Sequence, residues 1–257
     1  MMFNFKKKKP KIRFYSTEPG VPDVFPVVPT SQIERSWLNL PNFNHDTNGD
    51  MWTKNCPGIK LIMNAGWVIP APADFIIETN GDGIDFQWIE PIKFAHEKPP
   101  GNEIYIGFHD KDQSARLVNK KNTLQTVVKV NTPWRVEVSD DYLLLQMPVS
   151  YNNEFRFTSA QGILDPRYAH VLNIQLFWHE TNSKTIIKAG TPLAQFIPIK
   201  RNEYISTNFD FSVTEATEKD KQKERAFNYA LRCSELKYDT LKSRLKRVKS
   251  VLSKYAL

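Results

Sequence analysis

The stretch Gly162–Arg201, GILDPRYAHVLNIQLFWHETNSKTIIKAGTPLAQFIPIKR, is the part of the chain that best indicates its fold class. Three apolar runs within it, VLNIQLFW, KTIIKA and PLAQFIPIK, are short and are separated by polar turns. They are rich in β-branched and aromatic residues, which favour β-strands. The stretch therefore predicts at least three consecutive strands.

The same pattern continues toward the N-terminus. The runs DFIIET and IDFQWIE are joined by NGDG, whose Asn and Gly residues tolerate positive φ, so we predict a hairpin from Asp74 to Glu90. Further short strands are expected at KIRFYS, EIYIGF, LQTVVKV, WRVEVS, YLLLQMPV and EFRFT. Many short strands separated by turns predict an all-β barrel or sandwich. The predicted β-rich core covers residues 12–213.

Residues 214–257 differ from the rest of the chain in composition. They contain no Gly or Pro, and Thr214 or Thr217 is suited to cap the start of a helix. Apolar residues recur at alternating steps of four and three, a heptad pattern, once Ser234 is counted between Leu231 and Tyr238. These positions are Phe227, Leu231, Tyr238, Leu241, Leu245, Val248 and Leu252. We predict a basic amphipathic helix that serves as an interaction surface.

Three roles are open for this helix. It can pack on its own or a neighbouring subunit, form a coiled coil, or contact nucleic acid or a membrane surface. Lys237, Arg244 and Lys249 flank the heptad seam, where like charges would face each other in a parallel coil. That repulsion favours docking on an acidic surface.

The positive charge lies in two tails. Residues 218–257 hold 12 Lys and Arg against 5 Asp and Glu, whereas residues 14–217 hold 17 against 23. Residues 1–11 form a predicted flexible basic arm that includes Lys6, Lys7, Lys8 and Lys9. Both tails allow contact with nucleic acid. We expect no membrane contact through a spanning helix, because no apolar run approaches ~18 residues.

Residues 162–199 resemble the dUTPase and dCTP deaminase superfamily, which has a small β-clip barrel. The matching residues are Gly162, Ile163, Leu164, Asp165 and Tyr168, followed by Lys188, Gly190, Leu193, Ala194 and Gln195. The resemblance implies a dUTPase-like, β-clip or jelly-roll-like core and a trimer. In catalytic members, the residue matching Asp165 orients the attacking water, and the residue matching Tyr168 stacks on the deoxyribose.

The other parts that phosphate chemistry requires are missing from the sequence. No Ser-rich loop precedes Gly162, and no Gly-rich arm with an Arg closes the chain. Asp165 is therefore either a catalytic base with Mg²⁺ as cofactor or a turn residue whose carboxylate caps backbone donors. We favour the second interpretation and expect neither catalysis nor a cofactor.

Four of the five histidines directly precede an acid. Adjacent residues on a strand point to opposite faces, so such a pair cannot bind one metal ion, and no metal site is expected.

A broader resemblance covers CPGI, GWVIPAPADFIIE, AQGILD and AGTPLAQFIPIKR, which are similar to a set of tailed-bacteriophage proteins, notably those of cyanophages. It implies a non-enzymatic structural or interaction protein in the virion or the host cytoplasm, a homo-oligomer with other phage proteins as partners. Two alternatives remain. One is a nucleotide-binding or nucleotide-hydrolysing protein with a pocket around Asp165 and Tyr168, and the other is a host-takeover protein that binds an acidic host factor.

Overall fold

The computed structural model describes residues 9–39, 54, 56–90, 105–114, 122–235, 246 and 250. The chain divides into two compact units: Met1–Leu40 with Leu61–Ile205, and Pro41–Lys60 with Ser206–Leu257. The first unit is the β-rich core. Several predicted interaction residues lie outside the described residues: Lys6, Lys7, Lys8, Tyr238, Leu241, Leu245, Val248 and Leu252.

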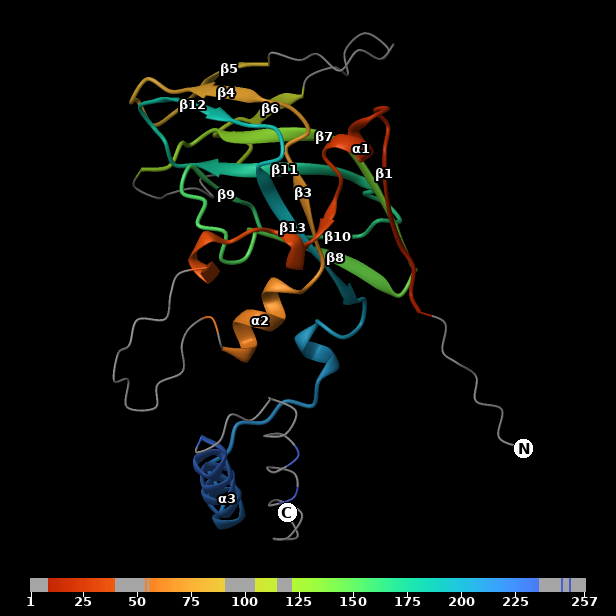
Figure 1. The fold of residues 1–257 in the computed structure, drawn as a ribbon, viewed down its shortest axis with the longest axis vertical. Coiled ribbons are helices and arrows are strands. Elements are labelled where there is room, and N and C mark those ends of the chain that lie inside the picture. Colours follow the sequence, from red (N-terminus) through yellow and green to blue (C-terminus); the bar gives the residue numbers. More distant parts are fainter. Residues whose placement is uncertain are drawn as a thin grey trace, which may run out of the picture. The chain divides into compact units, whose positions relative to one another are not determined.

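Strands make up most of the described elements (Figure 1). They are β1 (Ile12–Ser16), β2 (Val28–Pro29), β3 (Trp67–Pro70), β4 (Phe75–Glu78), β5 (Gln87–Ile89), β6 (Ile106–His109), β7 (Val127–Val138), β8 (Tyr142–Met147), β9 (Phe157–Ser159), β10 (Gly162–Leu164), β11 (Val171–Trp178), β12 (Lys184–Ile187) and β13 (Pro192–Lys200). The helices are α1 (Val21–Val24), α2 (Pro57–Met63), α3 (Glu218–Glu235) and the 3-10 turns η1 (Thr30–Gln32), η2 (Ser36–Asn39) and η4 (Ser206–Asn208).

The described strands form three antiparallel sheets, which confirms the predicted all-β class. Sheet A has the order β1-β7-β11-β9, with β6 also on β7; sheet B is β10-β8-β13-β3-β2; and sheet C is β12-β4-β5. The predicted hairpin is present, because β4 pairs with β5 in the register Ile76 to Ile89 and Glu78 to Gln87.

Two segments that were predicted as separate strands belong to one strand in the structure. LQTVVKV and WRVEVS form the single strand β7, which passes through Pro133. On one side of β7, β6 pairs with residues 127–130 and β1 with residues 134–138, so Pro133 lies in the gap between them. On the other side, the pairing with β11 shifts register between Val171 and Asn173. A proline without an N–H is tolerated where the ladder is interrupted, which is why the break predicted there is absent.

One hydrophobic core joins the three sheets. Alternate residues of β11 are buried, as expected for a strand with one face inward, and Trp178 at its end is fully buried. Phe75 of β4, Phe196 of β13 and Leu144 of β8 belong to the same buried cluster. The sheets are therefore layers of one packed unit.

Helix α3 is the described part of the predicted C-terminal helix. Thr217 caps it: the Thr217 backbone N–H donates to the Asp220 carboxylate at 2.9 Å, and the Asp220 N–H donates back to the Thr217 hydroxyl at 3.2 Å. Phe227, the first predicted heptad residue, is 41% exposed. Leu231 lies in the last turns of this helix. Among the described residues, no helix is long and apolar enough to cross a membrane.

Candidate functional site

Asp165 is held by two arginines. It follows β10, and its carboxylate accepts the Arg167 backbone N–H at 3.2 Å, the turn-capping role expected of it. Arg201, just after β13, donates from Nη1 at 2.5 Å and from Nη2 at 3.0 Å. Arg167 donates from Nε at 3.1 Å and from Nη2 at 2.8 Å. Both carboxylate oxygens are therefore occupied by guanidinium groups.

These contacts decide the protonation state of Asp165. The hydrogen bonds from Arg201, and then those from Arg167, hold its pKa well below the usual range for an aspartate. A general base works best with a pKa near the operating pH and a free lone pair directed at its proton. Asp165 has neither, so the geometry is that of a structural ion pair.

Tyr168 lies on the surface beside this cluster. Its side chain is 82% exposed, and the Arg167 guanidinium carbon lies 5.3 Å from the ring centroid. The structure thus brings the two resemblance-derived ligand residues, Asp165 and Tyr168, to one turn. It adds two cations there that the motif did not include.

A second feature follows the last strand. Residues 209–217 carry no regular secondary structure, yet Phe209, Phe211 and Val213 alternate with Asp210 and Ser212. Their side chains are 58%, 82% and 82% exposed. A period of two with one apolar face is the pattern of a half-buried β-strand. We name Phe209–Val213 the alternating segment.

Three of the described strands at sheet edges in the first unit carry exposed apolar side chains, as the alternating segment does. Among the described strands, β5, β10 and β12 each lie at a sheet edge, and each carries a part-exposed isoleucine: Ile89, Ile163 and Ile186. The β12 edge is partly covered, because Arg156 Nη1 donates to the Ile186 carbonyl at 2.9 Å. Unpaired edges are ready templates for another strand.

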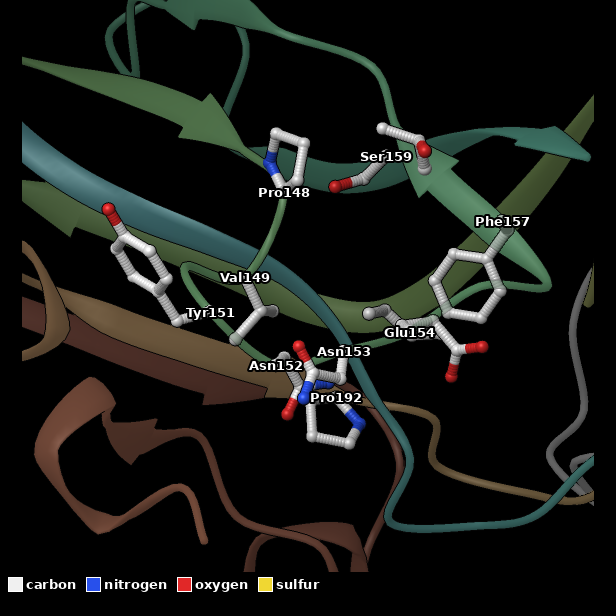
Figure 2. Close-up of a pocket in the computed structure, with 11 residues that line it drawn as sticks. Pro148, Val149, Tyr151, Asn152, Asn153, Glu154, Phe157, Ser159 and Pro192 are labelled. Carbon is white, nitrogen blue, oxygen red and sulfur yellow. The ribbon is translucent and has the colours of Figure 1, made fainter. Parts of the chain in front are cut away.

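The third feature is a pocket of about 150 Å³ (Figure 2). The loop between β8 and β9, β9 itself and the start of β13 line it. Ser159 of β9 is 2% exposed, and its hydroxyl has no hydrogen-bond partner among the described residues. A buried hydroxyl without a partner is costly, and among the groups of this kind in the described part of the chain Ser159 is the one that lines the pocket.

Three side chains hold the pocket loop in place, the buried Gln195 and Arg35 and the part-exposed Trp37. Gln195 accepts the Ser150 backbone N–H at 3.0 Å and donates to the carbonyls of Ile62 and Ala65. Arg35 Nε donates to the Ser150 carbonyl at 3.0 Å, and Trp37 Nε1 donates to the Tyr151 carbonyl at 2.9 Å. The loop is therefore fixed before any ligand arrives.

The loop also contains unusual backbone. Tyr151 has φ 57° and Asn153 has φ 54°, both in the left-handed region. Asparagine enters this region readily, whereas a tyrosine there costs ~1–2 kcal/mol. Strained residues that the surrounding contacts hold in place often mark binding sites.

Sequence reasoning missed most of these residues. The signal for the alternating segment was present in NFDFSV, but it lies between the last strand and the helix and was not recognised. Arg35, Arg201 and Ser159 gave no local signal, because their partners lie far away in the sequence. Gln195 lies in β13, within the strand predicted at PLAQFIPIK.

The described residues hold no group of three His, Cys, Asp or Glu side chains placed to bind a metal ion. His179 instead hydrogen-bonds to two threonine hydroxyls, Thr123 at Nδ1 and Thr158 at Nε2.

Comparison with protein-family models and with curated protein sequences found no match.

Proposed function

We propose that this chain is a non-enzymatic interaction protein that assembles with copies of itself. The alternating segment is the observation that carries this proposal. Phe209 and Phe211 expose large apolar surfaces on a stretch without regular secondary structure, which is unfavourable in water unless another surface covers them. A second copy of the chain is the occupant to which we commit.

The edge strand β10 is the receiving surface that fits best. It pairs only with β8 among the described strands, Ile163 is 46% exposed, and the space around the Gly162 Cα is open. Arg167, 44% exposed at its side chain, lies just beyond and offers a positive charge to Asp210. Addition of a strand to such an edge supplies backbone hydrogen bonds and pockets for alternate side chains.

The resemblance stated above extends this proposal. A dUTPase-like, β-clip core implies a trimer, and the likeness to tailed-phage proteins makes the virion or its assembly the expected setting. The basic helix is then a further contact, either to the acidic core of a neighbour or to an acidic partner.

Sedimentation velocity tests self-association. The intact chain is expected to sediment as an oligomer. The double substitution Phe209→Ser and Phe211→Ser should weaken the self-association constant about a hundredfold, because each buried Phe contributes at least ~1.4 kcal/mol. Phe155→Ser is the control, since Phe155 is 76% exposed and lies outside the segment. A monomeric intact chain, or an oligomer that both substitutions leave unchanged, would rule the proposal out.

Nucleotide binding without hydrolysis is the second candidate. The exposed Tyr168 ring with a guanidinium 5.3 Å away, and Arg201 close by, offers stacking and positive charge in one place. Because ligand binding to the folded state raises its stability, a nucleotide panel with and without Mg²⁺ should raise the melting temperature. A rise that Tyr168→Ala abolishes would support this candidate, and no rise would exclude it.

A further inference from the structure

The pocket beside β9 is electrically balanced. Glu154 is its one charged lining residue, and Arg156 pairs with both of its oxygens, at 2.8 Å from Nε and 2.6 Å from Nη2. Burial acts to raise the pKa of Glu154, but the hydrogen bonds from Arg156 outweigh it and the pKa is lowered. A phosphate or a cation would find no complementary charge, so the pocket suits a neutral ligand.

The lining supplies both donors and acceptors. The amides of Asn152 and Asn153 make no hydrogen bond to any other described residue, and each can donate and accept. The buried hydroxyl of Ser159 is likewise without a partner among the described residues, whereas the Glu154 carboxylate is already taken by the side chain and the backbone N–H of Arg156. This set matches hydroxyl groups, each of which both donates and accepts.

Apolar surfaces complete the pocket. The rings of Pro148 and Pro192 lie at its wall (Figure 2). The aromatic rings already contact others: Phe157 stacks on Trp178 at 6.1 Å and 14°, and Tyr151 packs against Trp37 at 6.1 Å. A nucleobase in this pocket would need an aromatic ring on which to stack. The C–H groups of a saturated ring, such as that of a sugar, instead pack well on the proline rings.

The volume sets the size of the ligand. Cavities of about 150 Å³ hold a single six-membered ring. We propose that the pocket binds one neutral sugar ring, as a free saccharide or as the end residue of a glycan, with Ser159, Asn152 and Asn153 hydrogen-bonded to its hydroxyls. This binding does not depend on self-association, because no lining residue belongs to β10 or to the alternating segment.

Ligand-observed NMR with methyl glycosides of glucose, galactose, mannose and N-acetylglucosamine tests the proposal, with uridine and cytidine as the competing class. At least one glycoside is expected to bind the intact chain. Ser159→Ala should weaken that binding about tenfold, the effect of one lost hydrogen bond to a buried group. Asn152→Ala should weaken it by a similar factor.

Ser150→Ala is the matched control. Its hydroxyl is also buried and unpartnered, but Ser150 does not line the pocket, so binding should be unchanged. Both serine variants should keep or raise the melting temperature of the free protein, because each removes an unsatisfied buried hydroxyl. Binding of nucleosides alone, of no glycoside, or of glycosides with equal affinity to the Ser159→Ala variant would overturn the proposal.

Discussion

Asp165 shows how two arginines turn a catalytic-looking motif into a structural one. Its carboxylate closes the turn after β10 and ties the ends of β10 and β13 together through Arg201. An aspartate with a lowered folded pKa stabilises the folded state above its unfolded pKa of ~3.9, and that stability is lost as the pH falls toward the folded value.

We therefore expect Asp165→Asn to lower the melting temperature at about pH 7 and to have little effect near about pH 2, where the wild type has lost most of the same contribution. Thermal unfolding of both proteins across this pH range is the measurement. A melting-temperature difference that stays constant with pH would show that the ion pairs do not act as described.

Gln195 is the residue on which the pocket loop depends. Gln195→Ala leaves the Ser150 N–H and the carbonyls of Ile62 and Ala65 without their partner, and it is expected to cost at least about 3 kcal/mol of unfolding free energy. Gln125→Ala, at an exposed position, should change it by less than about 0.5 kcal/mol. Equal losses in urea unfolding would contradict the assigned role.

For single residues, the sequence indicated which side chains matter, but not which distant side chains they contact. Asp165 was recognised as a turn-capping or catalytic residue, and the capping bond is present. Its depressed pKa could not be predicted, because Arg201 is 36 positions away in the chain and reaches it only through the pairing of β8 with β10 and β13.

At the scale of elements, Gly66 permits the approach of β3 to β13. It has φ +70°, and a Cβ there would lie 2.0 Å from the Phe196 carbonyl oxygen. Gly66→Ala should therefore cost about 3 kcal/mol or more, from the left-handed backbone and from the clash with a backbone that cannot rotate away.

Gly162→Ala is the control for that substitution, because nothing lies within 4 Å of its added Cβ and its φ is ordinary. It should leave the unfolding free energy nearly unchanged. Similar losses for the two variants, measured by denaturant unfolding, would count against the close approach of β3 and β13.

Most strands were predictable because period-two patterns act locally. Pro133 misled the prediction, because whether a proline breaks a strand depends on its neighbours in the sheet, and these are 100 or more positions away for β1. The alternating segment shows the reverse case. Its local pattern predicts a strand, but no described strand of the same chain pairs with it.

At the scale of the whole molecule, the separation of charge between the tails and the acidic core predicts salt-dependent binding to nucleic acid. Replacement of Lys6–Lys9 by glutamine should reduce the slope of log affinity against log salt by about 3 to 4, roughly one counterion per lysine. Titration of labelled duplex DNA at several salt concentrations measures this slope, and an unchanged slope would show that the arm makes no contact.

We expect the alternating segment to pair with another copy of the chain. Hydrogen exchange of the backbone amides in residues 209–213, followed by mass spectrometry at increasing protein concentration, tests it most directly. Strand pairing in trans requires fast exchange in dilute solution and protection that grows with protein concentration. Fast exchange at every concentration, or protection independent of concentration, would contradict it.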